Sequence, residues 1–282
     1  MIELYISSIA FTGVTVEGML DIVAKNGWAL EFSSGIPFRD DMEALYLNSK
    51  IKRMPHNYFP APEIPFVLNL ASTDESIRQQ SEQHCIRGLE LAKKSNSPFF
   101  AAHAGFCIDP NPHELGKKIN FKDDFDREIN KEVFIASVRK VLKAADDLGI
   151  DFLIENNVIA EFNLTNKTNP LLCCDALEIN WLFDTVKHNR LGLLLDTAHL
   201  KVSCMTLSKT IDHQFSEIQK NIKGIHHSDN DGKVDSNMPL TEQYWFLKYK
   251  DAFETLPQVL EVKGLTVEQI RKQINILNEI WN

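Results

Sequence analysis

The stretch GLLLDTAHL, residues 192–200, shows the pattern that decides the fold of this chain. A purely apolar run ends at an acidic residue, Asp196, and a histidine, His199, follows three residues later. Buried parallel β-strands are nearly pure hydrophobic runs, because both of their faces are covered by other elements. The stretch is therefore predicted to be a buried parallel strand whose C-terminal end carries functional polar side chains.

The same alternation of a short apolar run and a longer segment of helical period continues along the chain in both directions. Alternating strands and helices imply parallel strands joined by right-handed crossovers, and eight such units close into a barrel. The sequence therefore predicts an α/β fold, a (β/α)8 TIM barrel, with residues 1–282 as a single domain. The expected strands are 2–11, 29–32, 53–59, 98–104, 151–155, 190–196, 222–227 and 258–262, and the expected helices are 15–26, 40–48, 74–95, 126–148, 178–187, 209–220, 245–253 and 266–281.

Two of the expected helices begin at capping boxes. In such a box, a hydroxyl residue and an acid or amide three residues later satisfy each other's backbone N–H groups. The first box is predicted at residues 72–75 and the second at residues 266–269. Both support the division of the chain into strand–helix units.

The composition is that of an ordinary globular protein, with 282 residues of which 44% are hydrophobic and 24% charged. A net charge of −9 gives no overall attraction to nucleic acid or anionic lipid, so we expect neither nucleic acid nor membrane as a partner. Five cysteines form no CxxC pair and are odd in number, which favours a reducing compartment. Because the sequence also shows no signal-peptide pattern and no uncharged apolar run near the roughly 20 residues of a membrane span, we expect a cytoplasmic protein.

Ionisable side chains stand at the C-terminal ends of six successive expected strands. In a barrel, these strand ends converge on the mouth where active sites lie. Several buried carboxylates and imidazoles would repel one another, or stay protonated, without a cation between them. A divalent ion resolves this conflict, and mixed carboxylate and imidazole ligands suit Zn, Mn, Co or Fe better than Mg. The residues are His56, His103, Glu155, Asp196, the neighbours His226 and His227, and Glu261.

Four motifs lie at these strand ends: IENN at 154–157, GLLLDTAHL at 192–200, GIHHSDND at 224–231 and VLEVKG at 259–264. In their order and placement they resemble the xylose-isomerase-like barrel superfamily. That superfamily includes sugar and sugar-phosphate isomerases and epimerases, and also the endonuclease IV repair enzymes. The resemblance covers about residues 29–264, which is most of the chain.

The resemblance implies a shared metal site with four ligands. One ligand is a histidine that stands three residues before an aspartate, which favours His226, paired with Asp229, over its neighbour His227. Successive side chains of a strand point to opposite faces, so only one of the two histidines can easily face the barrel mouth. The implied ligands are Glu155, Asp196, His226 and Glu261.

The resemblance to the endonuclease IV branch extends to several ligands of its three-zinc cluster. The last ligand of its third zinc would be a histidine two residues after Asp235, where this chain has Asn237. An amide oxygen is a poor zinc ligand beside imidazole, so this departure argues against a repair nuclease. The positions that could hold additional metal or substrate are His56, His103, His199 and Asp235, with His227 as the less favoured neighbour of His226.

The resemblance implies an isomerase or epimerase that removes a proton beside a carbonyl group and returns it elsewhere or to the other face. A divalent metal ion (Mn, Zn, Co or Mg) would hold adjacent substrate oxygens and stabilise an enediolate. Glu155 and Glu261 are the expected acid and base. His103 and His199 are expected to contact hydroxyl groups of a small carbohydrate, a sugar or sugar phosphate, and Lys263 could bind a phosphate or simply be solvated.

Two other functions remain open from the sequence. The chain could be an endonuclease IV-like metal-dependent phosphodiesterase on abasic DNA, because most of that enzyme's ligand positions are filled. It could also be a barrel without catalysis that acts as a binding module. The long segment 156–175 could form a lid over the pocket or a contact in a homo-oligomer.

Overall fold

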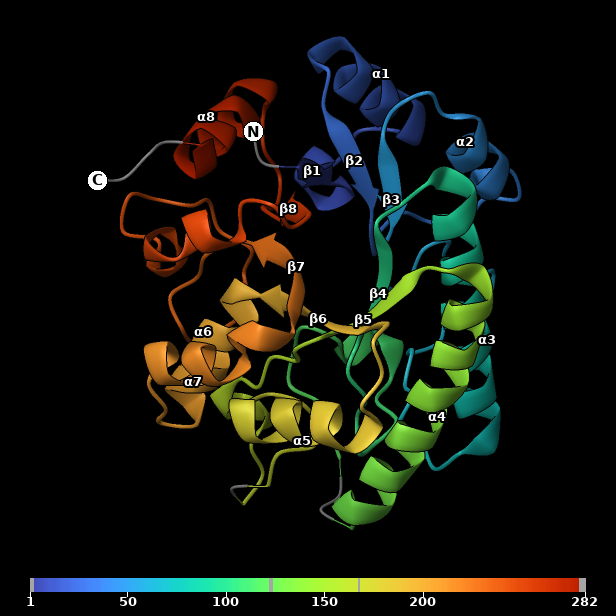
Figure 1. Cartoon of the computed structure of the whole chain (residues 1–282), viewed down its shortest axis with the longest axis vertical. Coiled ribbons are helices and arrows are strands. Elements are labelled where there is room, and N and C mark those ends of the chain that lie inside the picture. The colour runs from blue at the N-terminus through green and yellow to red at the C-terminus, as the bar shows by residue number, and fades with distance from the viewer. Residues whose placement is uncertain (1–2, 122–123, 167, 279–282) are drawn as a thin grey trace.

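The computed structural model describes residues 3–121, 124–166 and 168–278. Eight parallel strands form one sheet in the order β3-β2-β1-β8-β7-β6-β5-β4, which curls into a nearly closed barrel (Figure 1). At the seam between β3 and β4, the N–H of Asn57 donates to the carbonyl of Ala101 at 2.8 Å. The predicted (β/α)8 barrel is confirmed. Its strands are β1 Leu4–Ser7, β2 Ala29–Phe32, β3 Arg53–Pro55, β4 Phe99–His103, β5 Asp151–Glu155, β6 Leu191–Asp196, β7 Ile222–His227 and β8 Gln258–Leu260.

Helices surround the barrel, and the long helices α3 and α4 run side by side along one flank (Figure 1). Within the described residues, no helix is both long and apolar enough to cross a membrane. The helices are α1 Val16–Asn26, α2 Met42–Asn48, α3 Glu75–Ser95, α4 Arg127–Leu148, α5 Ala176–Val186, α6 Thr197–Thr206, α7 Ile211–Ile218 and α8 Val267–Asn278. Shorter 3-10 turns are η1 Ser8–Phe11, η2 Pro112–Glu114, η3 Glu161–Asn163, η4 Gln219–Asn221, η5 Trp245–Lys248 and η6 Lys250–Phe253.

The structure differs from several of the elements predicted from the sequence, most clearly in three places. β1 is shorter than the run 2–11, because a 3-10 turn follows it directly, and β3 ends at Pro55 because the chain bends at Asn57 with φ of 47°. The predicted helix 245–253 consists of two 3-10 turns that place Phe246 against Phe215, with ring centroids 5.7 Å apart. Residue 2 of the first predicted strand and residues 279–281 of the last predicted helix lie outside the described residues.

The helix α6 was not predicted and begins directly after Asp196, the residue at which β6 ends. One carboxylate oxygen of Asp196 accepts the N–H of His199 at 2.7 Å. An acid in this position satisfies one of the unpaired N–H groups of the first helical turn. The same residue therefore ends the strand at the barrel mouth and starts a helix there, which fixes His199 beside it.

One predicted capping box is confirmed and the other is wrong. At residues 266–269, the N–H of Thr266 donates to the side chain of Gln269 at 2.8 Å, and the N–H of Gln269 donates back to the Thr266 hydroxyl at 3.2 Å. Helix α3 is instead capped by Asp74, whose carboxylate accepts the N–H of Ser76 at 2.8 Å. The Ser72 hydroxyl donates to Asp109, a loop residue after β4, and this tertiary partner explains the error.

A layer of apolar side chains fills the inside of the barrel. β7 contributes only Gly224, where a Cβ atom would lie 2.7 Å from the Phe99 ring, so the glycine makes room for that ring. Side chains alternate between the faces of a strand, so the residue two positions further along each strand also points inward, one level closer to the mouth. That next level is polar. The apolar layer consists of Tyr5, Ala29, Met54, Phe99, Ala101, Leu153, Leu194 and Val259.

Candidate metal and substrate site

A polar ring lies directly above the apolar layer, with one side chain contributed by each strand or by the residue that follows it. Each member stands two positions after a residue of the apolar layer, or after Gly224 in β7, so strand alternation turns it toward the barrel axis. His103 is the most open member, with 30% of its side chain exposed, and the others are buried. The polar ring consists of Ser7, Glu31, His56, His103, Glu155, Asp196, His226 and Glu261.

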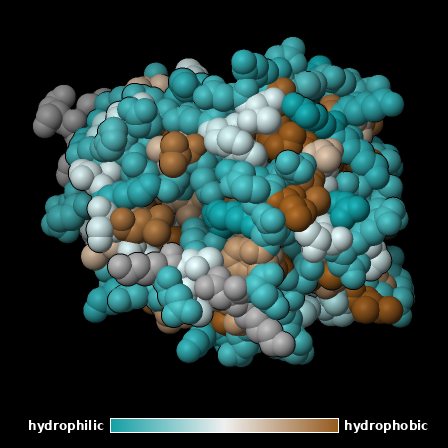
Figure 2. All heavy atoms as spheres, turned by 90° about the horizontal axis from the view of Figure 1, so that it is seen from below, coloured by the Kyte–Doolittle hydropathy of each residue, from teal (hydrophilic) through white to brown (hydrophobic). Residues whose placement is uncertain are grey.

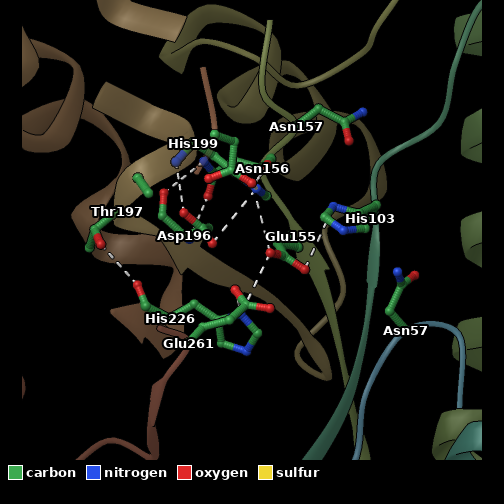
Figure 3. A network of polar contacts seen from close by, with 12 residues as sticks. Asn57, His103, Glu155, Asn156, Asn157, Asp196, Thr197, His199, His226 and Glu261 are labelled. Carbon is green, nitrogen blue, oxygen red and sulfur yellow. Dashed lines mark hydrogen bonds and ion pairs between the residues drawn. The ribbon is translucent and has the colours of Figure 1, made fainter. Parts of the chain in front are cut away.

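Four members of the polar ring each bring a potential ligand atom within 4.8 Å of the other three, and they converge in Figure 3. Oδ2 of Asp196 is buried and has no hydrogen-bond partner among the described residues. Burial raises the pKa of this carboxyl well above its usual range, against the opposing effect of His199. A divalent cation would satisfy the unpaired oxygen and offset the crowded charge, so the group fits a metal ion. The four are Glu155, Asp196, His226 and Glu261, the set that the resemblance implies.

Glu155 lies at the centre of the polar ring and is surrounded by imidazoles. Its Oε2 is 2.8 Å from Nε2 of His56, and its Oε1 is 3.6 Å from Nδ1 of His226. Burial alone would raise the pKa of Glu155, but the charges of His103, His56 and His226 outweigh it and hold the pKa well below its usual range. Glu155 is therefore an ionised carboxylate that can bind a cation or accept a proton.

His226 is held on both sides by carboxylates. Its Nδ1 lies 2.9 Å from Oε2 of Glu261, and its Nε2 lies 2.8 Å from Oε2 of Glu31. Burial alone would lower the pKa of His226, but the charges of Glu31, Glu261 and Glu155 outweigh it and raise the pKa well above its usual value. When Glu31 accepts the Nε2 proton, Nδ1 is left to contact the other carboxylates or to bind a metal ion. A carboxylate that accepts the proton of the second ring nitrogen is a usual partner of a metal-ligating histidine.

His103, Glu155 and His199 form a second group of potential ligands within 4.8 Å of one another. Nδ1 of His199 donates to the carbonyl of Asn156 at 2.9 Å, which directs Nε2 toward Oδ2 of Asp235, 3.2 Å away. Oδ1 of Asp235 is buried and has no hydrogen-bond partner within the described part of the chain. This second group can therefore hold either a polar substrate atom or a further cation.

A cavity of about 420 Å³ opens above this second group. His103, His199 and Asp235 line its polar floor, and the segments that follow β3, β4 and β5 form its walls. A neighbouring cavity of about 610 Å³ contains Lys263 and Asn237. Ser34 lines both cavities, so the two spaces adjoin at this residue.

The structure places two of the predicted site residues, His227 and Lys263, outside both the polar ring and the lining of the cavity above His103. His227 points to the opposite face of β7, with Nδ1 2.9 Å from the Tyr244 hydroxyl and Nε2 2.8 Å from Oε1 of Gln258. Burial lowers its pKa to about 4. Lys263 is exposed and lines the neighbouring cavity, away from the cavity above His103.

Two members of the ring, Ser7 and Glu31, were not predicted from the sequence, and of these only Glu31 is ionisable. This residue is fully buried in β2, whose four residues are otherwise apolar. A glutamate inside a buried strand requires a partner, because burying an unpaired carboxylate costs several kcal/mol. That signal was present in the sequence at ALEF, residues 29–32.

Fold and site together define a (β/α)8 barrel with a group of potential metal ligands at the C-terminal ends of its strands. The chain belongs to the xylose isomerase-like TIM barrel family, whose family model matches residues 15–270. The family indicated by the four sequence motifs is therefore confirmed.

Individual relatives are distant. The chain is 24% identical to MJ1614, an uncharacterised protein of Methanocaldococcus jannaschii, over 216 residues that cover 76% of this chain and 73% of that protein. Its structure is similar to that of a D-tagatose 3-epimerase-like protein, with a TM-score of 0.72, 14% identity and coverage of 98% and 95% of the two chains. It is also similar to an AP endonuclease, family 2, from Brucella melitensis, with a TM-score of 0.67, 13% identity and coverage of 99% and 100%. At such identities the similarity establishes a common fold, and the activity has to be argued from the site.

Proposed function

We propose that the protein is a divalent-metal-dependent isomerase or epimerase that acts on a sugar or a related hydroxycarbonyl compound. The observation that supports this most strongly is the group of Glu155, Asp196, His226 and Glu261 beside a cavity with a polar floor. Bound to that group, a divalent ion supplies Lewis-acid stabilisation for negative charge that develops on a substrate oxygen.

Glu155 and Glu261 have the properties of a proton-transfer pair. They come from β5 and from the end of β8, three positions apart in the order of the sheet, so they approach the centre from different sides. Burial favours the neutral form of Glu261, but His226 outweighs it and lowers the pKa of Glu261, as the histidines do for Glu155. Both carboxylates are thus ionised near neutral pH, and either can accept a proton from a substrate carbon.

His103 and His199 are placed to hold substrate oxygens at the floor of the cavity. Among the described residues that line this cavity, none is a lysine or arginine. A phosphate group bound there would lack the cation that usually accompanies it, so the lining favours an unphosphorylated substrate over a sugar phosphate.

Solvent-proton exchange tests the proposal. The metal-free protein is reconstituted with Mn²⁺ and incubated in deuterated water with a panel of ketoses and aldoses, and NMR detects deuterium at the carbon beside the carbonyl. We expect exchange in the wild type and at least a roughly hundredfold loss in Glu261→Gln, since general acid–base groups typically contribute 10²–10⁴-fold.

Glu82→Gln is the matched control, because Glu82 is a buried carboxylate of α3 that pairs with Lys140 of α4, on the helices that flank the barrel. Glu82→Gln should exchange like the wild type. Absence of exchange with every sugar, in protein that binds Mn²⁺ and is folded, would contradict the proposal.

A nuclease like endonuclease IV is the second candidate, favoured by the pairing of His199 with Asp235 and by the position of His56 against Glu155. Asn237 argues against a nuclease, because this residue lines the neighbouring cavity and not the cavity above His199. Its backbone carbonyl accepts the N–H of Lys263 at 3.0 Å, which holds the residue at that place. Three tightly bound zinc ions per chain together with nicking of abasic duplex DNA would replace the isomerase proposal with this one.

A further inference from the structure

The cavity above His103 and His199 differs sharply between its floor and its walls. The floor presents imidazole and carboxylate groups, whereas the walls are mostly aliphatic and aromatic side chains. Most wall residues come from the segments after β3, β4 and β5, and they include Phe66, Phe106 and Ile119. One end of a bound molecule therefore meets polar groups and the other end meets an apolar surface.

Most polar side chains in the walls already have partners in the protein; an exception is Asn57, whose buried Oδ1 has no hydrogen-bond partner among the described residues. The amide of Asn157 donates to the carbonyls of Ala104, at 2.8 Å, and of Leu172, at 3.0 Å. Asn163 accepts the N–H of Ile119 at 2.8 Å, and the Tyr58 hydroxyl accepts the N–H of Phe66 at 2.7 Å. These side chains hold the loops together, so the walls offer few hydrogen bonds to the hydroxyls of a sugar chain. A hydroxyl buried without a partner is unfavourable.

Three large apolar side chains at this cavity remain partly exposed: Leu115 at 44%, Phe162 at 39% and Val234 at 37%. Figure 2 views the molecule from the end of Figure 1 at which the segments after β4 and β5 lie, and hydrophobic residues reach that surface in several separate patches. Apolar residues gathered at the lining of a pocket, beside convergent polar groups, are typical of a site for a small molecule with an apolar part.

From this contrast we infer that the substrate is an uncharged compound with a polar hydroxycarbonyl head and an apolar substituent, aromatic or alkyl. The head lies at the polar ring, and the apolar substituent fills the cavity between Phe66, Ile119 and Phe162. The absence of lysine and arginine from the described lining agrees with an uncharged compound. This inference rests on the proposed function for the head group, whereas the apolar subsite depends on the walls alone.

Two probes that share the same reacting head test the inference. Erythrulose ends in a hydroxymethyl group, and its analogue carries a phenyl ring in place of the terminal hydroxyl. With Mn²⁺-loaded protein in deuterated water, we expect the phenyl analogue to exchange its proton with a KM at least about tenfold lower, because a buried aromatic ring gains that much in affinity. Equal or better KM for erythrulose would overturn the inference while leaving the proposed isomerase function in place.

Phe162→Ser and Leu177→Ser provide the matched pair of variants. Phe162 lines the cavity and is 39% exposed, and Leu177 is 76% exposed at the start of α5, outside the cavity lining. Neither substitution therefore creates a cavity in the hydrophobic core. Phe162→Ser should raise the KM for the phenyl analogue about tenfold and change that for erythrulose by less than about twofold. Leu177→Ser should leave both unchanged, and a loss shared by both variants or by both probes would overturn the inference.

Direct binding separates this inference from the proposed function. Ligand-observed NMR with Mg²⁺-loaded protein measures binding of the phenyl analogue whether or not the protein turns it over. If the analogue binds the wild type, and Phe162→Ser alone weakens it, the apolar subsite is supported even when no exchange occurs with any sugar. If the analogue does not bind, or binds Phe162→Ser as well as the wild type, the inference is wrong whatever the exchange assay shows.

Discussion

Glu31 should control how tightly the polar ring binds a metal ion, although it is not itself among the four potential ligands. Its Oε2 lies 2.8 Å from Nε2 of His226, and its side chain is fully buried. A buried hydrogen bond to a charged group contributes about 1.5–3 kcal/mol. The loss of such a partner behind a metal ligand typically weakens metal binding 10–100-fold, or about 1.4–2.7 kcal/mol, which agrees with that estimate.

We therefore expect Glu31→Gln to weaken Zn²⁺ or Co²⁺ binding roughly tenfold and Glu31→Ala roughly a hundredfold. Isothermal titration calorimetry on metal-free protein measures the Kd, and the Co²⁺ absorption spectrum reports the ligand geometry. Glu31 also favours the protonated form of His226, which competes with the metal. The loss of metal affinity in the Glu31 variants should accordingly be largest at alkaline pH, where protons no longer compete with the metal for His226.

Glu82→Gln is again the control, since it removes a buried carboxylate that pairs with Lys140. It should bind metal like the wild type. Unchanged Kd and an unchanged Co²⁺ spectrum in both Glu31 variants, with folding intact by circular dichroism, would refute the assignment of Glu31 as the residue that positions His226.

Three further predictions concern stability. Chelation of bound metal should lower Tm and added Mn²⁺ or Zn²⁺ should restore it, because a ligand that binds only the folded state stabilises it; calorimetry measures both. Gly88→Ala should cost roughly 1–3 kcal/mol in urea denaturation, since its Cβ would lie 2.2 Å from the buried Phe100 ring. Burial lowers the pKa of His84 from 6.5 to about 4. Between pH 6.5 and pH 4, His84 is therefore protonated in the unfolded chain and neutral in the folded protein. Stability should therefore fall as pH falls from 6.5 to 4, by up to about 3 kcal/mol, and His84→Gln, compared with wild type by urea denaturation at pH 7 and pH 4, should lack this component.

Barrel and polar ring were largely predictable because both depend on strand periodicity. Each member of the polar ring stands two residues after a residue of the inner layer, or after Gly224 in β7, as Glu155 follows Leu153 and Asp196 follows Leu194. Glu31 obeys the same rule after Ala29, but a four-residue strand is too short for its inner face to be recognised without its neighbours. The same alternation explains why His227 points away from the ring while His226 points into it.

The cavity walls were not predictable, because the segments after β3, β4 and β5 have no regular period. Their conformation depends on tertiary hydrogen bonds such as those from Asn157 to the carbonyls of Ala104 and Leu172. The helix α6 was missed for a related reason, since its N-cap, Asp196, also belongs to the polar ring and was interpreted only in that role.

Asn237 affects both the number of metal ions that the site can hold and the class of substrate that it can accept. A third ion beside His199 and Asp235 would need another strong ligand, but Asn237 adopts a left-handed conformation with φ of 45° and lines the neighbouring cavity. His199 and Asp235 are then left facing the cavity with a buried oxygen, Oδ1 of Asp235, that has no hydrogen-bond partner within the described ranges. A pair that lacks its third metal ligand can instead receive a hydroxyl or carbonyl group. This arrangement favours an uncharged hydroxycarbonyl substrate over a phosphodiester, because the cavity that the pair faces has apolar walls and, among its described lining residues, no lysine or arginine.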